Sequence, residues 1–420
     1  MKTYRVLRRL VAPVACVAAL AAPAHAQTLT LEEALRIGEA QSPRLSAQRH
    51  ALSAAQEQTG RATELPDPKL RLGLENLPVT GADRFRYDRD FMTMRQIGFM
   101  QEFPNSAKRE ARGARAERMR DVERGTLASQ RATLNRDIAV AWLDVHFAER
   151  ALAVQERLIG QLQAQAETTA AGIARGRQGA AESFMARAAV EQARDRLLDL
   201  ERMAERARLA LAALLGDDAR RPLASAPDFT RFSHAREALV ERLHEHPQLR
   251  VLDVREELAR AEVELARASK KSDWSLEVGY GQRRPAFDDM LTVMVAIDLP
   301  WQAERRQDRD VASRLAEVEQ ARALREEARR MHEAEVRGWL ADYDIGERRI
   351  ERYRTLVIPL ARDRAEAALA AYRGGRGELQ PLLDAQRAVT EAELALLAVE
   401  SERAKAWAAL NYLYPHEVRP

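Results

Sequence analysis

Two long runs of helix-forming residues, each broken by glycines at an equivalent point, dominate this 420-residue sequence. The first break reads RGRQGAAESFMARA at 175–188, and the second reads RGGRGELQPLLDAQ at 373–386. Gly377 follows Gly179 by 198 positions. Because glycine readily adopts the left-handed backbone that closes a helical hairpin, each break predicts a turn between two antiparallel helices.

The matching breaks indicate an internal duplication, the first pattern to look for in a chain of this kind. Four other pairs of segments follow in the same order in both halves, separated by 204, 206, 196 and 197 positions. These pairs are SPRL (42–45) and HPQL (246–249), DPKLRLGL (67–74) and DWSLEVGY (273–280), FP (103–104) and LP (299–300), and WL (142–143) and WL (339–340). Each match is weak alone, so the prediction depends on their constant order and spacing.

The predicted repeats cover residues 27–215 and 235–415, with a turn-rich linker at 216–234 and a tail at 416–420. Each repeat is predicted to run as a helix, two alternating segments, a very long helix, a glycine turn and a final helix. The ranges are 31–62, 67–103, 105–174, 175–180 and 180–215, and then 235–270, 273–300, 305–373, 373–378 and 378–412. The predicted tip-turn glycines are Gly176, Gly179, Gly374, Gly375 and Gly377.

The helix lengths match one another within each repeat. A helix of about 70 residues spans ~105 Å, and two helices of about 35 residues placed end to end span the same distance. Each repeat therefore predicts two columns of equal length, and the chain predicts four. The low aromatic content of 5% and the predominance of Ala, Leu, Glu and Arg favour long helices over a compact globular domain.

Residues 1–26 read as a secretory signal peptide that is cleaved after Ala26. A basic leader precedes the apolar stretch Leu10–Ala24, which is short for a membrane anchor, the alternative interpretation. Cys16 is the only cysteine, and Pro13 stands where a lipid-attachment motif needs leucine. The predicted mature chain therefore has no thiol for disulfides, metal sites or catalysis.

Charge and missing motifs exclude several classes of function. Four of the 67 basic residues lie in the leader, which leaves 63 against 64 acidic residues and removes the basis for nucleic-acid binding. The mature sequence contains no Gly-x-Ser-x-Gly motif and no phosphate-binding loop, so we expect no enzyme and no cofactor. It also contains no apolar run of 18 residues, so no membrane-spanning helix is predicted.

Alternating apolar and polar residues predict strands with one apolar face. The pattern is clearest at 70–75, 274–280 and 291–299, and weaker at 97–103, where Ile97, Phe99 and Phe103 continue it. Ordinary soluble hairpins are one interpretation, but an exported chain also permits transmembrane strands of about 9–11 residues. Four strands are too few for a barrel, which needs about eight, so a membrane role predicts oligomerisation. Three chains would supply twelve strands and twelve helical columns.

The chain resembles the TolC family of outer-membrane channel proteins over nearly all of its mature length. The resemblance rests on ALRIGEAQSPRL (34–45), LPDPKL (65–70), QEFPNSAKREAR (101–112), the two WL pairs and GELQPLLDAQ (377–386). It implies a mainly α fold with a small β part: duplicated long-helix hairpins form an α-helical barrel, and four transmembrane strands per chain complete a trimeric 12-strand barrel. The LPDP and EFP segments look most like the cobalt–zinc–cadmium efflux branch.

That resemblance implies a passive exit duct of a tripartite efflux pump in the outer membrane of a Gram-negative bacterium, extending into the periplasm. The implied partners are two further copies of the chain, a periplasmic adaptor, a proton-driven inner-membrane pump and outer-membrane lipid, without nucleic acid. Divalent heavy-metal cations are the implied cargo, and drug or organic-solute efflux or type I secretion is the alternative. A periplasmic coiled-coil scaffold or pump adaptor is the second alternative, and an enzyme is the third.

The lower tip in this family is closed by tyrosine, arginine and aspartate side chains, and it docks the adaptor. Tyr372 and Asp384 match such positions, whereas Pro381 and Gly377 occupy two others. The neighbouring Arg376 and Glu378 offer substitutes, so Tyr372, Arg376, Glu378 and Asp384 are the predicted aperture residues. Carboxylates repeated about a threefold axis would favour cations. The alternative is that Asp384 only faces solvent or caps a helix start.

Two groups of residues are candidate metal ligands. His244 and His246 precede a helix start, but side chains two positions apart do not share a helix face and no third ligand is evident. Met92, Met94 and Met100 could offer soft thioether contacts near the first hairpin, or could pack against lipid or neighbouring strands. The sequence therefore predicts no defined metal site.

Overall fold

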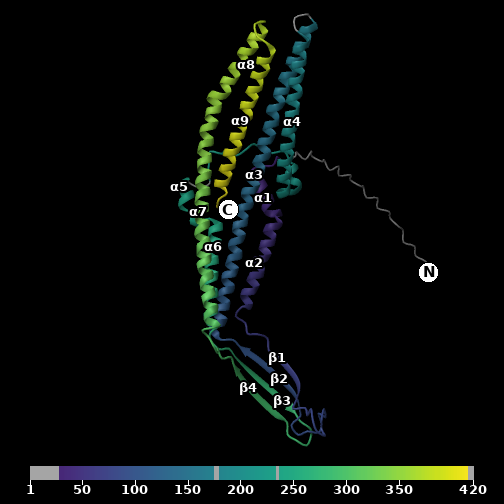
Figure 1. Ribbon diagram of the computed structural model, residues 1–420, viewed down its shortest axis with the longest axis vertical. Coiled ribbons are helices and arrows are strands. Elements are labelled where there is room, and N and C mark those ends of the chain that lie inside the picture. The colour runs from purple at the N-terminus through teal and green to yellow at the C-terminus, as the bar shows by residue number, and fades with distance from the viewer. Residues whose placement is uncertain (1–27, 175–178, 233–235, 415–420) are drawn as a thin grey trace, which may run out of the picture.

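The computed structural model describes residues 28–174, 179–232 and 236–414, and it has the predicted fold class, a long helical body with a small sheet at one end (Figure 1). The predicted leader at 1–26, Gly176 and the tail at 416–420 lie outside the described residues. The first half contains α1 (Leu31–Gln41), α2 (Pro43–Arg61), β1 (Lys69–Glu75), β2 (Met94–Phe103), α3 (Ser106–Ala174), α4 (Ala180–Leu215) and a short 3-10 turn, η1 (Gly216–Arg220).

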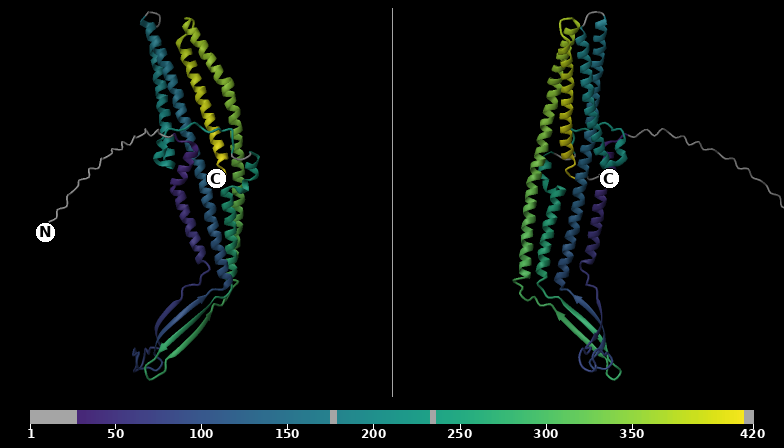
Figure 2. Two further views of the ribbon diagram at one scale, coloured as in Figure 1. Left: turned by 180° about the vertical axis from the view of Figure 1, so that it is seen from behind. Right: turned by 45° about the vertical axis from the view of Figure 1, so that its right-hand side comes forward.

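The second half repeats this order of elements. It contains α5 (Arg236–Glu241), η2 (Leu243–Glu245), α6 (Pro247–Ala268), β3 (Trp274–Gln282), β4 (Met290–Ile297), α7 (Gln307–Arg352), η3 (Tyr353–Val357), α8 (Ile358–Arg373) and α9 (Leu379–Asn411). The helix α3 and the α7–α8 rod each extend from the sheet to a tip, while shorter helices accompany them (Figures 1 and 2). The sheet is inclined to the helical body in both views of Figure 2.

The predicted first helix of each repeat, over 31–62 and 235–270, is wrong as a single helix. At Ser42 the backbone leaves helical geometry, and its hydroxyl accepts a hydrogen bond from the Leu45 N–H at 3.2 Å. Pro43 then occupies the first turn, where its missing N–H costs nothing. His246 and Pro247 break the second copy at the equivalent place. A proline at a helix start thus limits the preceding helix, since it disfavours helical geometry in the residue before it.

The predicted helix over 305–373 is continuous but contains a π-helical turn, η3. Pro359 follows this turn within the first residues of α8. Proline cannot donate the backbone hydrogen bond that an α-helix requires, and a π-turn is one way to accommodate the lost bond. No proline stands in the equivalent part of α3, which is an uninterrupted helix of 69 residues.

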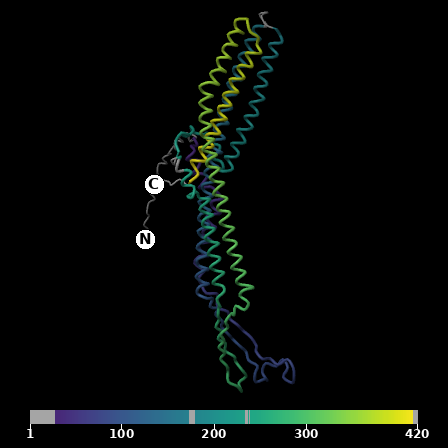
Figure 3. Tube along the Cα trace, turned by 60° about the vertical axis from the view of Figure 1, so that its left-hand side comes forward, coloured from purple at the N-terminus to yellow at the C-terminus, as the bar shows by residue number. Residues whose placement is uncertain are grey.

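The largest core cluster lies at mid-length, where the linker crosses the long helices (Figure 3). Trp142 of α3 is fully buried, and its indole N–H donates to the Leu29 carbonyl at 3.1 Å. Tyr343 of α7 donates its hydroxyl to the Phe229 carbonyl at 2.7 Å, and Trp407 of α9 donates to the Arg231 carbonyl at 2.6 Å. The last two bonds fix the linker to α7 and α9, and Trp142 fixes the segment at Leu29 to α3. The Leu29 N–H in turn donates to the Pro222 carbonyl of the linker at 2.8 Å. The linker and the Leu29 segment thus form a belt that joins the two halves.

His246 is buried inside this region and contacts His332 of α7, with ring centroids 4.5 Å apart. Burial lowers the pKa of His246 to about 3, and the positive charges of His332 and Arg136 act in the same direction. The Tyr414 ring covers another side of the imidazole. The folded chain therefore holds His246 neutral at every physiological pH.

Acid is expected to destabilise the fold through His246. Its folded pKa lies below the unfolded value of about 6.5, so the contribution to stability is complete above pH ~6.5 and is lost as the pH falls toward 3. The midpoint of thermal unfolding, followed by circular dichroism across this range, should fall less steeply in His246→Asn than in wild type. The exposed neighbour supplies the control, because His244→Asn should retain the wild-type slope. Equal slopes for all three proteins would contradict the assignment.

A second core cluster packs the two tip hairpins together. Leu158 and Leu162 of α3, Val190 of α4 and Leu382 and Leu383 of α9 are all buried there. Apolar positions three to four residues apart lie on one face of each helix, which explains why these helices pack along a continuous seam. Among the described helices, none combines the length and the apolar character needed to cross a bilayer.

Candidate functional site

The four strands form one antiparallel sheet in the order β1-β2-β3-β4. The central pair joins the two halves of the chain, with Phe99 opposite Val278 and Phe103 opposite Trp274. The strands β1 and β4 form the edges, and each has one side without a strand partner. Such edges offer unpaired backbone groups to another strand.

Register places the leucine, isoleucine, valine and aromatic side chains of the strands on one face. Leu72, Ile97, Tyr280 and Leu291 form one apolar row across the four strands, and the next row toward the helical body, with Leu70, Phe99, Val278 and Val293, repeats this character. In the next row toward the far end, Leu74 lies opposite the polar Arg95. Leu72 is 73% exposed and Leu291 is 72% exposed, so nothing in a single chain covers this face. A contiguous apolar surface of this kind marks a contact with lipid or with another protein.

The opposite face of the sheet is polar. Its charged side chains are Lys69, Arg71, Glu75, Glu102 and Glu277, three carboxylates against two basic groups. Lys69 pairs with Glu102, and Arg71 Nη1 lies 2.9 Å from Glu277 Oε2. Glu75 has no ion-pair partner among the residues described. The two faces thus differ as the lipid side and lumen side of a membrane strand differ.

Aromatic residues lie at both ends of the strands. Near the helical body, Phe103 and Trp274 stack with centroids 4.2 Å apart, and Trp301 is 77% exposed. At the far end, Phe91 lies 6.3 Å from Phe287 between ring centroids. Tyrosine and tryptophan at strand ends are typical of the interfacial girdles of transmembrane sheets.

Asp273 connects the sheet to the helical body. It directly precedes β3 and accepts a hydrogen bond from the Asn105 N–H at 2.9 Å, just before α3 begins. Its second oxygen lies 2.6 Å from Lys108 Nζ. A carboxylate at a helix N-terminus is stabilised by the free N–H groups there, so this contact fixes the start of α3 beside the sheet.

At the tip between α8 and α9, α8 ends in a well-formed Schellman turn. Gly375 has a φ of +67°, the Arg376 N–H donates to the Ala371 carbonyl at 3.0 Å, and the Gly375 N–H donates to the Tyr372 carbonyl at 3.1 Å. A Cβ on Gly377 would lie 3.0 Å from Ala371 Cβ. Backbone conformation at Gly375 and close approach at Gly377 therefore explain two of the predicted tip glycines.

All four predicted aperture residues lie at this tip. Tyr372 packs against the tip core, Arg376 is exposed, and Glu378 is the N-cap residue of α9 without a side-chain capping bond. Asp384 lies in α9, where it accepts a hydrogen bond from Gln380 Nε2 at 2.9 Å. Within the described part of one chain, no ion pair joins Arg376 to either acidic residue. Their role at an aperture stays a prediction. At the other tip, Gly179 is the N-cap of α4.

Gly375→Ala should destabilise the tip by about 1–2 kcal/mol, because a Cβ is strained in the left-handed region. The same change at Gly160, a helical glycine with free space around its Cα, should stabilise by about 1 kcal/mol. Thermal unfolding and the rate of trypsin cleavage after Arg373 and Arg376 measure both effects. Faster cleavage is expected in Gly375→Ala alone, and an unchanged rate in that variant would contradict the role of the turn.

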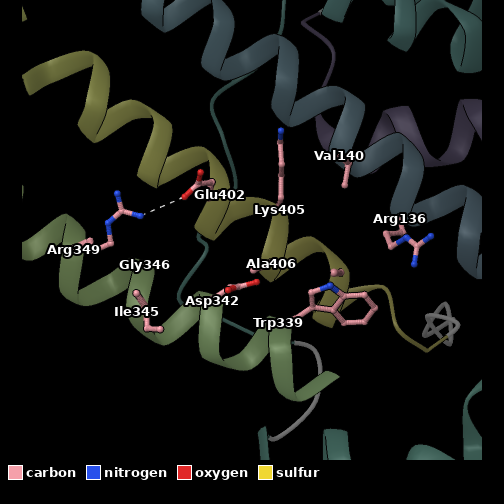
Figure 4. Close-up of a pocket in the computed structure, with 11 residues that line it drawn as sticks. Arg136, Val140, Trp339, Asp342, Ile345, Gly346, Arg349, Glu402, Lys405 and Ala406 are labelled. Carbon is pink, nitrogen blue, oxygen red and sulfur yellow. Dashed lines mark ion pairs between the residues drawn. The ribbon is translucent and has the colours of Figure 1, made fainter. Parts of the chain in front are cut away.

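A groove of about 530 Å³ lies between α3, α7 and α9, which sequence analysis did not detect (Figure 4). Arg136, Trp339, Asp342 and Lys405 line it, and Arg349 pairs with Glu402 at 3.6 Å along its side. Lys405 and Trp407 lie on nearly opposite sides of α9, because two residues correspond to about 200° around the helix. Because Trp407 contacts the linker, the groove opens on the side of α9 away from the belt. Only three-dimensional packing brings these side chains together.

No group of three or more His, Cys, Asp or Glu side chains in the described chain could hold a metal ion. The two candidate histidines lie in different environments, since the His244 side chain is 76% exposed and His246 is buried. The methionines considered with them lie in or beside the first hairpin, where Met94 and Met100 belong to β2 and Met92 precedes it.

Comparison with known proteins identifies similar sequences and folds. The family model described as outer membrane efflux protein matches residues 34–217. A membrane protein from Pseudomonas aeruginosa matches with a TM-score of 0.77 and 19% identity over 91% of this chain and 93% of that one. The outer membrane protein VceC from Vibrio cholerae gives 0.76 and 19% over 91% and 95%. The CmeC outer membrane channel of Campylobacter jejuni gives 0.78 and 12% over 93% and 87%. No curated protein sequence matches significantly.

Proposed function

We propose that this chain, whose residues 34–217 match the model of the outer membrane efflux protein family, is a passive outer-membrane exit duct of a tripartite efflux pump. Members of that family are channels, so the prediction that the chain is not an enzyme is confirmed. The export signal predicted at 1–26 supports delivery across the inner membrane, with cleavage after Ala26 and insertion into the outer membrane of a Gram-negative bacterium.

One observation carries the proposal: the sheet has an exposed apolar face and two open edges, and it stands at the end of a long helical body. Lipid would cover the apolar face, and the edge of β4 would pair with β1 of a second copy. Four strands cannot close around a lumen, whereas twelve strands from three copies exceed the minimum of about eight. The functional unit is therefore a homotrimer, with the polar face of each sheet lining the duct.

The helical body would cross the periplasm and end at the tips. Tyr372, Arg376, Glu378 and Asp384 lie together at the α8–α9 tip, so three copies would bring three such sets around one axis. We assign the aperture and the docking of a periplasmic adaptor to this end. Because the sequence has no nucleotide-binding loop, the energy for transport comes from the inner-membrane pump, which we propose to be proton-driven.

Heavy-metal cations, of the divalent class implied by the sequence resemblance, are the proposed cargo. The polar face of the sheet carries one more carboxylate than basic groups, and Glu75 is unpaired among the described residues. Repeated three times, this face would give the duct wall a net negative charge, which favours cations. Drug or organic-solute efflux and type I secretion are alternative uses of the same architecture.

Membrane extraction and gel electrophoresis test the duct directly. The expressed full-length chain should remain in the outer-membrane fraction after washing with carbonate or urea, and should run as a trimer on a gel until it is heated. Release by carbonate or urea as a monomer would instead identify a periplasmic scaffold or adaptor.

Deletion of the gene tests the cargo. Growth of the deletion strain should become sensitive to zinc, cobalt or cadmium, and the plasmid-borne wild-type gene should restore tolerance. Increased sensitivity to antibiotics with unchanged metal tolerance would replace the metal assignment by drug efflux.

A further inference from the structure

All four methionines within the strands lie on the polar face of the sheet. In the strand register, Met94, Met100, Met290 and Met294 alternate with the apolar set, which contains no methionine. Methionine is an apolar residue, and burial against lipid would place it on the other face together with leucine, isoleucine and valine. Hydrophobic burial therefore does not account for this segregation.

The first row of thioethers crosses three strands at one level. Met100 of β2 pairs with Glu277 of β3, and Glu277 pairs with Met294 of β4. The Glu277 carboxylate lies over Gly98, where a Cβ would come within 3.3 Å of its Oε1, and it also contacts Arg71. Two thioethers thus flank a carboxylate that lies along the surface of the sheet.

The second row lies nearer the far end of the strands and runs diagonally, because Met94 is two residues away from the level of Met290. Met94 pairs with Glu75 of β1, and Met290 pairs with Gly281 of β3. The Met94 side chain occupies the space above Gly281, since a Cβ on this glycine would come within 2.5 Å of Met94 Sδ. Because Gly281 has no side chain, the Met94 thioether can extend from β2 over β3. Glu75, without an ion-pair partner in the described structure, adds a carboxylate to this row.

We propose that these two rows are transit sites for soft, thiophilic monovalent cations such as Ag⁺ and Cu⁺. Thioether sulfur is a neutral soft ligand that selects Cu(I) over hard divalent cations. A channel requires sites that are weak and repeated, because a tightly bound ion would not leave. In the trimer each row would present six thioethers around the lumen.

This inference rests on the proposed function, because the polar face becomes a channel wall only in the assembled barrel. It adds soft monovalent cations, which prefer sulfur, to the divalent cargo proposed above. No thiol competes for such ions in the predicted mature chain, since Cys16 is the only cysteine and lies in the leader. Silver binding at sulfur would therefore report on methionine.

Methionine oxidation provides a readout for each residue. The detergent-purified wild-type protein would be treated with hydrogen peroxide, with and without Ag⁺, and sulfoxide formation followed by peptide mass spectrometry. Ag⁺ should slow oxidation of Met94, Met100, Met290 and Met294 several-fold, while Na⁺ and Zn²⁺ should not. Met203 of α4 and Met331 of α7, which are 55% and 59% exposed, serve as internal controls and should remain unprotected.

A cellular experiment tests transport. The variant combining Met94→Leu, Met100→Leu, Met290→Leu and Met294→Leu conserves side-chain volume, and Met203→Leu with Met331→Leu is its matched control. Cells with the fourfold variant should tolerate silver as poorly as the deletion strain, while control cells keep wild-type tolerance.

Two results would overturn the inference: equal protection of Met203 and Met331 by Ag⁺, or no protection of the sheet methionines in the wild-type protein. Wild-type silver tolerance in cells whose fourfold variant forms a membrane trimer would overturn it as well. The proposed duct would survive each of these results, because it fails only if the wild-type chain does not form a membrane-embedded trimer.

Discussion

Val293→Lys is expected to prevent the chain from entering the membrane. Val293 lies in the middle of β4 on the apolar face, pairs with Val278 and is 62% exposed in the single chain. A lysine on the lipid face at mid-bilayer costs about 2–4 kcal/mol, and each of the three copies would carry one. The heat-dissociable trimer should disappear from the outer-membrane fraction.

The neighbouring residue supplies the matched control. Thr292 belongs to the same strand but lies on the polar face, opposite Gly279. Thr292→Lys introduces the same charge into what we propose to be the water-filled side, so the trimer should assemble normally. If both variants assembled alike, or if Thr292→Lys were the more damaging, the assignment of lipid and lumen faces would be wrong.

Trp142→Ala should cause the largest loss of folding stability, about 3–5 kcal/mol. The indole is fully buried, stacks on His146 with centroids 5.5 Å apart, and donates to the Leu29 carbonyl. Alanine would leave a cavity in the mid-length core and would remove one of the two hydrogen bonds that the Leu29 carbonyl accepts, the other coming from the Ala224 N–H at 3.1 Å. Denaturant or thermal unfolding in detergent, followed by circular dichroism, measures the loss.

Two further variants separate the contributions of this side chain. Trp142→Phe keeps most of the apolar volume but removes the N–H donor, and should cost only about 1–2 kcal/mol beyond repacking. Trp301→Ala removes an indole that is 77% exposed and should leave the unfolding midpoint of the helical body unchanged. A Trp142→Ala midpoint equal to that of Trp301→Ala would show that the belt does not hold the fold together.

Local patterns were sufficient to predict most elements of the fold. Apolar residues repeat about every 3.6 residues in helices and every 2 residues in strands. The helix at 105–174 and the alternating segments were therefore recognisable in the sequence. The breaks at Ser42 and His246 were missed although each precedes a proline, because the surrounding residues favour helix equally well. The π-turn before Pro359 was missed for a related reason, since proline can kink, end or be absorbed by a helix.

The site required information that no local pattern holds. Pairing of Phe99 with Val278 joins residues far apart in the chain, and only this register shows that the sheet methionines share the polar face. The groove beside Trp339 likewise depends on three helices that meet in space. Resemblance alone placed Tyr372, Arg376, Glu378 and Asp384 at one tip, and an aperture among them would need residues from other copies.

The unpaired edges of β1 and β4 also bear on how such a protein is made. On the proposed route through the periplasm, each chain presents two unpaired strand edges and an apolar surface to water before it meets its partners, and such edges pair non-specifically with other strands. Trimer assembly competes with aggregation, so the yield of trimer should be highest at a moderate rate of synthesis and should decline above it. The proposed route therefore calls for chaperones that hold the unassembled chain in the periplasm.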